Sequence, residues 1–267
     1  MAERLEHRWF AADPISLSWV SFYGIILAAW TGLFAMTSAA ALPFGTSGSL
    51  PTLLLEICRA GADPLTAGWS ALFFMWALMA LGMMAPTAVP LLSAWRDIER
   101  ARPDRTTTGG FWLVLGGYLA VWLAFAGAAA LAQRTIADAG WMSASDRLAS
   151  PWAVAALLVV AGSYQFSRLK DACVSRCRSP MAYLTAHWRP GAGAAFAIGL
   201  RNGAACLGCC WALMLLGFGA GTMNLIWMGL ATVLMITEKL PDVGRLVTRP
   251  LGVGLLIAAA GVALQSI

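Results

Sequence analysis

The chain has 267 residues, of which 60% are hydrophobic and 12% are charged, and its mean hydropathy is +0.72. A soluble domain carries roughly 25% charged residues, so the composition excludes an ordinary soluble protein. Apolar runs of about 20 residues recur along the chain, and each is long enough to cross a bilayer as a helix. We therefore expect an all-α, polytopic transmembrane helix bundle that forms a single integral membrane domain over residues 1–267.

The apolar runs predict seven membrane spans, and the first is expected to be retained rather than cleaved as a signal peptide. The connection between the fifth and sixth spans, GFGAGT, is so short that these two helices must form an antiparallel hairpin. Pro241 is expected to end the sixth span. The predicted spans are residues 15–42, 67–94, 109–133, 151–170, 193–219, 222–240 and 249–267.

Lysine and arginine are distributed unevenly over the predicted loops. The N-terminal segment and the loops after the second, fourth and sixth spans hold 14 of them, whereas the opposite loops hold only Arg59, Arg134 and Arg147. Because basic residues are enriched in cytoplasmic loops, this bias predicts a cytoplasmic N-terminus, an external C-terminus and an odd number of spans. The net charge of +5 is explained by this topology, and no basic-aromatic patch indicates nucleic-acid binding.

Three cysteines occur within five positions of the fifth predicted span, in the stretch CLGCCWALM. On a helix they share one broad face with the methionine that follows and the asparagine one turn earlier. Thiolates and thioethers are soft ligands that select Cu(I), and thiolates also bind zinc. One buried cysteine is usually a small hydrophobic residue, but three on one face favour a metal or redox site. The face comprises Asn202, Cys206, Cys209, Cys210 and Met214.

The second predicted span carries a run of methionines in MWALMALGMMAPTAVP. Met75, Met79 and Met83 recur every fourth residue and share a face, onto which Pro86 and Pro90 also project. Packing in the core is the favoured explanation of such a stripe, and a ladder of weak Cu(I) ligands is the alternative. The two prolines interrupt the backbone hydrogen bonds, so we expect this helix to be kinked.

The sixth predicted span ends in two charged residues. Glu238, which shares a face with Met223, is expected to attract a cation or relay a proton. Lys239 is expected to snorkel to the interface, and a simple interfacial pair of the two charges is the alternative. Arg201 lies several residues inside the fifth span, where we expect it to pair with Glu238 or to reach the cytoplasmic interface.

The loop predicted after the fourth span contains Cys173 and Cys177 in the stretch DACVSRC. The nearby arginines favour thiolates, but no histidine or further cysteine pair completes a four-ligand zinc site there. An entry or acceptor site for the metal is one interpretation, and an incidental pair is the favoured one. His7 and His187 lie outside the predicted spans, which disfavours haem or histidine-ligated copper within the membrane.

The stretches MWALMALGMMAPTAVP, CLGCCWALM and GTMNLIWMGLATVLMITEKL together resemble a bacterial family described as predicted metal-binding integral membrane proteins. The resemblance covers the second span and the hairpin of the fifth and sixth spans. It implies a metal site and no particular activity, and Gly82 stands where many members are expected to have alanine. The signature positions that it implies here are Met75, Met79, Met83, Met84, Pro86, Cys209, Cys210, Met214, Met223, Asn224, Met228, Glu238 and Lys239.

We predict a bacterial inner-membrane protein that handles Cu(I), with zinc as the alternative ion. It would transport copper or deliver it to a membrane or extracytoplasmic copper enzyme, so its predicted partners are the metal ion, the bilayer and a copper protein. The sequence has no phosphate-binding loop pattern, which makes ATP-driven pumping by this chain unexpected. The predicted ligands are Cys206, Cys209 and Cys210 as primary ligands, and Met75, Met79, Met83, Met214, Met223 and Glu238 as secondary or pathway ligands.

Two alternatives use the same residues. Cys206 and Cys209 have the spacing of a redox pair, so the chain could be a membrane thiol oxidoreductase if a partner disulfide reaches them. The chain could also be an accessory subunit of a larger membrane complex, with its cysteines and methionines serving only as packing. Cysteines at the outer end of the span would favour the redox reaction, and buried cysteines would favour a metal. We do not expect an enzyme.

Overall fold

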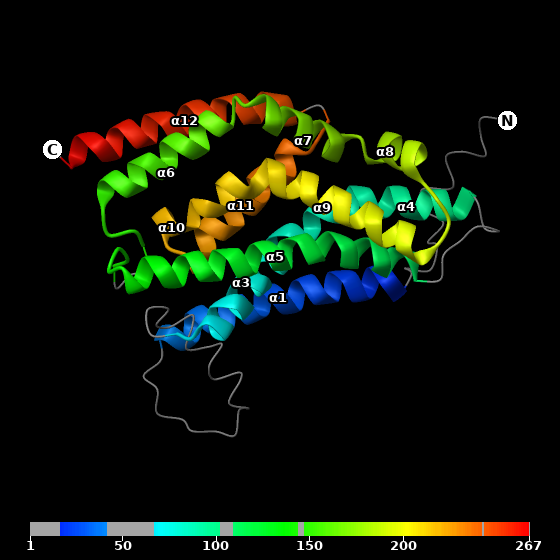
Figure 1. The fold of residues 1–267 in the computed structure, drawn as a ribbon, viewed down its shortest axis with the longest axis horizontal. Helices are drawn as coiled ribbons and strands as arrows, with labels where there is room; N and C mark the ends of the chain where they lie inside the picture. The colour runs from blue at the N-terminus through cyan, green and yellow to red at the C-terminus, as the bar shows by residue number, and fades with distance from the viewer. Residues whose placement is uncertain (1–16, 42–66, 102–108, 144–146, 242, 267) are drawn as a thin grey trace, which may run out of the picture.

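The computed structural model describes residues 17–41, 67–101, 109–143, 147–241 and 243–266 (Figure 1). The described residues confirm the all-α helix bundle, with one isolated β-bridge between Met142 and Leu148. Cys58, Arg59 and the basic N-terminal segment lie outside the described residues. The helices are α1 Leu17–Ala41, α3 Trp69–Met84, η2 Pro86–Ala88, α4 Val89–Ala101, α5 Gly110–Asp138, α6 Pro151–Tyr164, α7 Arg168–Arg178, α8 Pro180–His187, α9 Ala192–Leu215, α10 Gly217–Ala220, α11 Leu225–Glu238 and α12 Gly244–Gln265.

The long helices run roughly along the longest axis of the molecule (Figure 1). α6 and α12 pack side by side on one face, α9 follows with α7 and α11, and α5, α3 and α1 complete the other face. The start of α1 and the end of α12 lie at opposite ends of this axis. Which end faces the cytoplasm stays a prediction.

Among the described residues, four helical segments are long and apolar enough to cross a membrane, and two bent helix pairs raise the number to six. The four are α1, α5, α9 with α10, and α12. The remaining predicted span, residues 222–240, contains α11, whose 14 residues fall short of the roughly 20 that a membrane helix needs. The chain is therefore a membrane protein with four to six candidate spans, and the expectation of seven full spans is corrected at α11.

The predicted proline kink is present in the second span. α3 and the segment that begins at Pro86 meet at an angle of 41°. Because Pro86 has no N–H, the carbonyl of Gly82 lacks its helical donor and accepts instead from Nε1 of Trp30 at 3.1 Å. The kink is thus stabilised by a side chain from the neighbouring helix α1.

The segment predicted as a loop after the fourth span is helical. α7 follows α6 at an angle of 61°, and the Ser167 side chain caps it by accepting from the N–H of Lys170. Lys170, Val174 and Cys177 are buried at the spacing of one helical face, and this face packs against α9. The loop prediction was wrong because the polar composition of this segment concealed an amphipathic helix.

α5 and α9 approach each other unusually closely. A Cβ atom on Gly199 would lie 2.0 Å from the carbonyl oxygen of Val114, and one on Gly117 would lie 2.1 Å from that of Phe196. Small residues at such positions allow helix backbones to touch within a membrane. One turn further along α9, a Cβ atom on Gly203 would lie 2.8 Å from the carbonyl oxygen of Tyr118 on α5. These glycines fix the distance between the two helices next to the cysteine cluster.

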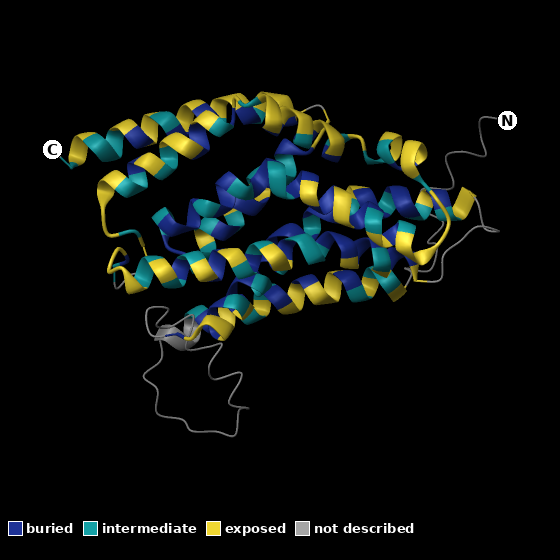
Figure 2. Cartoon of the chain, in the orientation of Figure 1, coloured by how far each residue is buried: buried dark blue, intermediate teal, exposed yellow. Residues whose placement is uncertain are grey.

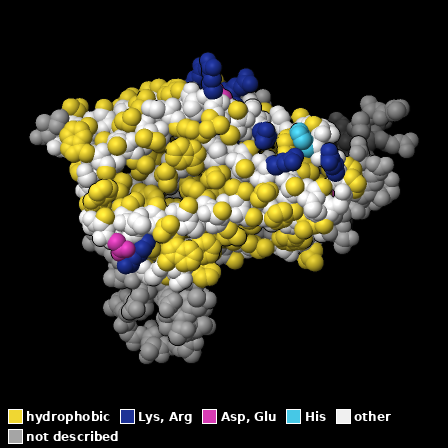
Figure 3. Space-filling view, viewed as in Figure 1, with side chains coloured by type: hydrophobic (Ala, Val, Ile, Leu, Met, Phe, Trp, Pro, Cys, Tyr) yellow, Lys and Arg dark blue, Asp and Glu magenta, His cyan; other side chains and the backbone are white. Residues whose placement is uncertain are grey.

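Buried positions concentrate around α3, α5, α9 and α11, whereas α6 and α12 carry many exposed residues (Figure 2). α9 with α10 is the most buried of the four unbroken candidate spans. Hydrophobic side chains cover most of the visible surface, as expected for helices that face lipid, and basic side chains gather over α7 and α8 (Figure 3). Helix α9, which carries the three clustered cysteines, is therefore enclosed by the other helices.

We expect Gly199→Ala to destabilise the protein, because its Cβ would collide with a backbone carbonyl that cannot move independently of α5. Overpacking of this kind costs about 1–3 kcal/mol. Thermal unfolding in detergent, followed by tryptophan fluorescence, measures the effect. Gly193→Ala, in the first turn of the same helix with open space around it, is the control and should be neutral or slightly stabilising. An unchanged Tm for Gly199→Ala would contradict the close contact of α5 and α9.

Candidate metal centre

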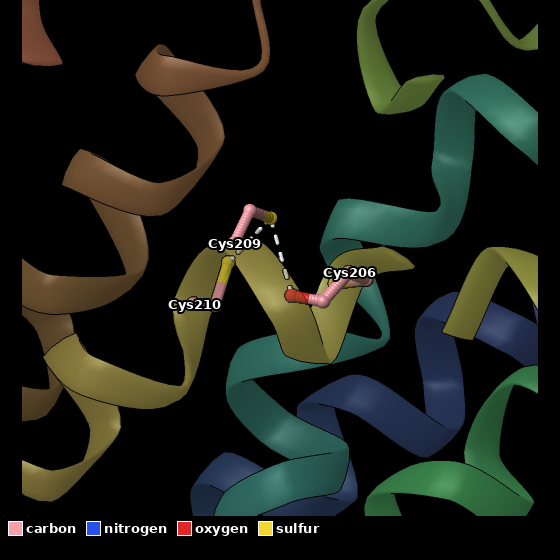
Figure 4. A group of neighbouring side chains, drawn as sticks. All are labelled: Cys206, Cys209 and Cys210. Atoms are coloured by element: carbon pink, nitrogen blue, oxygen red, sulfur yellow. Dashed lines mark hydrogen bonds between the residues drawn. The ribbon is translucent and has the colours of Figure 1, made fainter. Parts of the chain in front are cut away.

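Cys206, Cys209 and Cys210 form a compact sulfur cluster on α9, which we call the triad. Their Sγ atoms all lie within 4.8 Å of one another, and each residue is at most 1% exposed. Cys209 Sγ lies 3.3 Å from Cys210 Sγ and donates to the carbonyl of Cys206 at 3.1 Å (Figure 4). The spacing in the sequence thus produces three soft ligands in one buried place.

The triad lies in the middle of a candidate membrane span. α9 and α10 together form the apolar segment Ala192–Ala220, and Cys206 has 14 residues of this segment on either side. The cysteines are therefore remote from both ends of the span. This is the placement that the sequence analysis associated with a metal rather than with thiol–disulfide exchange.

Lys239, the residue that follows α11, points its ammonium group at the triad. Its Nζ lies 2.9 Å from Cys206 Sγ, and the residue is 7% exposed. A buried ammonium is costly unless it is paired, and Cys206 supplies the pairing here. The contact therefore favours the thiolate form of Cys206. The expectation that Lys239 snorkels to the interface was wrong, because α11 ends against α9.

A hydrogen-bond network connects the kinked second span to Cys206. The tight turn of η2 leaves the Met84 carbonyl without its α-helical donor, and the Thr87 hydroxyl donates to it at 2.8 Å. Since Thr87 satisfies this carbonyl, the hydroxyl proton of Tyr118 is available to Cys206 Sγ at 2.8 Å. The Tyr118 hydroxyl also lies 3.1 Å from the Met84 carbonyl oxygen. This oxygen is a second possible acceptor for the Tyr118 proton. Sequence reasoning missed both side chains.

Glu238, next to Lys239, is held in a buried ion pair. Lys170 Nζ lies 2.8 Å from both carboxylate oxygens, and the two side chains are 1% and 2% exposed. The same ammonium also donates to the side-chain oxygen of Gln165. The predicted pairing of Glu238 with Arg201 was wrong, because α7 folds back over α9 and brings Lys170 to the carboxylate, while Arg201 is exposed.

The methionine stripe is buried on a different helix from the triad. Met75, Met79 and Met83 are 0%, 3% and 2% exposed on α3. α3 packs mainly against α5, α1 and α11. The stripe therefore belongs to the core that surrounds α9, and its use as a Cu(I) ladder stays a prediction.

The remaining predicted ligands differ in their burial and in their position relative to the triad. Met214 is buried one turn after the triad on α9, and Met223 is half-buried in the turn before α11. Glu238 already binds Lys170, so it is not one of the residues that group with the cysteines. Asn202 is buried one turn before Cys206, and its Oδ1 has no hydrogen-bond partner among the described residues.

The PpoB2 family, described as copper chaperone, matches residues 73–262. The match spans well over half of the chain and contains the triad with its hydrogen-bonding partners. No curated protein and no solved structure matches the chain. The match supports the expected relation to a metal-handling family. Its description differs from the resemblance noted in the sequence motifs, since it names copper and a carrier role.

We expect Tyr118→Phe to weaken Cu(I) binding, because it removes the hydroxyl that lies 2.8 Å from Cys206 Sγ. Loss of a hydrogen bond to a ligand atom typically reduces metal affinity by about tenfold. Competition with a coloured Cu(I) chelator measures this change. Tyr183→Phe, on α8 outside the centre, is the matched control and should bind like the wild type. Equal affinities of all three proteins would remove Tyr118 from the centre.

We expect Lys170→Met to lower stability strongly, because it leaves the Glu238 carboxylate buried without its partner. Breaking a buried ion pair in this way costs about 3–5 kcal/mol. The double variant Lys170→Met with Glu238→Gln should recover much of the loss, since neither residue 170 nor residue 238 then carries a charge. Arg168→Met on the same helix is exposed and serves as the control. A single variant as stable as this control, by thermal unfolding, would contradict the buried pair.

Proposed function

Because the chain belongs to the copper chaperone family PpoB2, we propose that it binds one Cu(I) ion at the triad, within a bacterial inner membrane, and delivers it to a copper protein. The observation that carries this proposal is the cluster of three buried sulfur atoms within 4.8 Å, one of which faces Lys239. Soft sulfur ligands of this kind select Cu(I).

The number of ligands favours Cu(I) over zinc. Structural zinc is almost always bound by four ligands in a tetrahedron. Among the described residues, no fourth histidine, cysteine or carboxylate ligand atom lies within 4.8 Å of all three triad sulfurs. Cu(I) is satisfied by two or three sulfur ligands, so the triad offers what this ion needs.

The local charges also suit a monovalent ion. Before binding, the Lys239 ammonium and the Cys206 thiolate cancel each other. One Cu(I) bound by two thiolates beside Lys239 again gives zero net charge, with the third cysteine remaining a thiol. A divalent ion would reach neutrality only by ionising the third thiol as well, and the triad by itself would supply three of the four ligands that structural zinc takes. Because unbalanced charge is costly in a buried site, the arrangement favours Cu(I).

The surrounding residues prepare the triad for binding. Lys239 holds Cys206 as a thiolate before the ion arrives, and Tyr118 stabilises the same sulfur by hydrogen bonding. Burial excludes water and oxidants, which keeps the thiols reduced and the copper in its monovalent state. Delivery then needs only the replacement of one sulfur ligand by another, without nucleotide hydrolysis.

The thiol oxidoreductase alternative is less well supported. Thiol–disulfide exchange requires a partner sulfur to reach the attacking thiolate. Cys206 and Cys209 are 0% and 1% exposed and lie in the middle of a span. Their burial opposes access by a protein disulfide and favours a small ion as the visitor.

The proposal predicts close to one Cu(I) per chain after anaerobic purification and loading, measured by elemental analysis beside zinc. The combined replacement Cys206→Ser, Cys209→Ser and Cys210→Ser should abolish binding, because hydroxyls are poor ligands for Cu(I). A folded wild-type protein that holds no Cu(I), or a triple variant that still holds it, would contradict the proposal.

A methionine variant tests whether Cu(I) binds at the triad or at the methionine stripe. Met75→Leu, Met79→Leu and Met83→Leu conserve side-chain volume while removing three thioethers, so the core should tolerate them. If the triad is the site, this variant retains its Cu(I) and nearly wild-type affinity. Loss of the ion with an intact fold would instead assign binding to the stripe.

A further inference from the structure

A second pair of cysteines lies against the triad on another helix. Cys173 and Cys177 stand four residues apart on α7 and share the side that packs on α9. Cys177 is 8% exposed, whereas Cys173 is half-buried and therefore more accessible. Both are free thiols. The favoured sequence interpretation of this pair as incidental did not anticipate this placement.

The Cys173 sulfur is seated directly on α9 beside the triad. A Cβ atom on Gly208 would lie 2.6 Å from Cys173 Sγ, so the absence of a side chain at Gly208 makes room for this sulfur. Gly208 immediately precedes Cys209 in the chain. The hydroxyl of Tyr164, at the end of α6, donates to the Gly208 carbonyl. α6 and α7 are thus both anchored at the turn of α9 that carries the triad.

Cys177 links the pair to the triad. Its side chain lies close enough to Cys209 to interact with it, and the Cys209 sulfur lies 3.3 Å from that of Cys210. Sulfur atoms therefore continue from half-buried Cys173 through Cys177 to the fully buried cluster. Soft ligands placed in succession allow a soft ion to pass from one to the next without entering water.

α7 is held over the triad by contacts with the end of α11. Lys170 binds the Glu238 carboxylate, and Arg178 Nε donates to the Glu238 carbonyl at 2.9 Å. Glu238 directly precedes Lys239, which contacts the triad. The position of the cysteine pair is therefore fixed relative to the triad by the same short segment.

We propose that Cys173 and Cys177 form an exchange site through which Cu(I) passes between the triad and a sulfur-bearing carrier on the side of α7. This inference rests on the proposed function, since it requires Cu(I) at the triad. The carrier is expected to be anionic, because a Cu(I) ion bound by two thiolates has a net negative charge and the exposed side of α7 carries Arg168 and Arg176.

The exchange step is a substitution of sulfur ligands. The Cys177 sulfur forms a bond to Cu(I) held by Cys206 and Cys209, and the bond from Cu(I) to Cys206 breaks. Cys177 releases its thiol proton, and the departing Cys206 sulfur keeps its electron pair and takes up a proton. Cys173 then replaces Cys209 as a ligand in the same manner. Copper remains monovalent throughout, so the step requires no oxidant or reductant.

The rate of copper release tests this role. In the double variant Cys173→Ser with Cys177→Ser, Cu(I) stoichiometry and equilibrium affinity should match the wild type. Transfer to bathocuproine disulfonate, an anionic Cu(I) chelator, should be slower by about tenfold, which corresponds to a barrier higher by about 1.4 kcal/mol. Ser175→Ala on the exposed side of α7 is the control and should transfer at the wild-type rate.

Gly208→Ala provides a test that keeps every cysteine. Its methyl group would displace Cys173 Sγ from α9, so transfer should again slow while the triad still binds one Cu(I). Gly193→Ala, with open space around it, is the matched control. A wild-type transfer rate in the double cysteine variant, or a loss of equilibrium affinity that matches the change in rate, would overturn the exchange site. Failure of the wild type to bind Cu(I) would refute the proposed function itself.

Discussion

A buried ammonium beside a buried sulfur is the contact on which the centre depends. Lys239 Nζ lies 2.9 Å from Cys206 Sγ, and neither a lone ammonium nor a lone thiolate is stable away from water. Lys239 joins α11 to α9, while the preceding residue, Glu238, joins α11 to α7 through Lys170. Two successive residues of opposite charge thus hold three helices around the triad. This gives a physical reason for the shortness of α11, whose end is part of the centre rather than a membrane boundary.

Departures from regular helix geometry supply the remaining partners of the triad. The break around Pro86 leaves backbone carbonyls without helical donors. Trp30 donates to the carbonyl of Gly82, and Thr87 donates to that of Met84, next to Tyr118 and Cys206. Glycines such as Gly199 bring α5 into backbone contact with α9, which sets Tyr118 against the sulfur. The three sulfur atoms and their hydrogen-bond partners are preorganised in this way, because backbone geometry fixes their positions.

Features that depend on one helix alone could be predicted from the local sequence pattern. The common face of the cysteines follows from helical spacing, and the kink follows from proline chemistry, so both were predictable. Lys239 points inward and Glu238 pairs with Lys170 because of how helices distant in the sequence pack. A single sequence does not reveal this packing. Helix α7 did leave a signal, since the N-cap Ser167 and the apolar spacing that includes Cys177 are typical of an amphipathic helix. Its high charge hid that signal.

X-ray absorption spectroscopy at the copper edge of the loaded, anaerobic protein would reveal which atoms bind the ion that we propose at the triad. We expect monovalent copper whose nearest neighbours are two or three sulfur atoms, and we expect this signal to disappear when the three triad cysteines are replaced by serine. A nearest shell of nitrogen or oxygen atoms, or an unchanged spectrum in the serine variant, would show that the triad does not bind Cu(I).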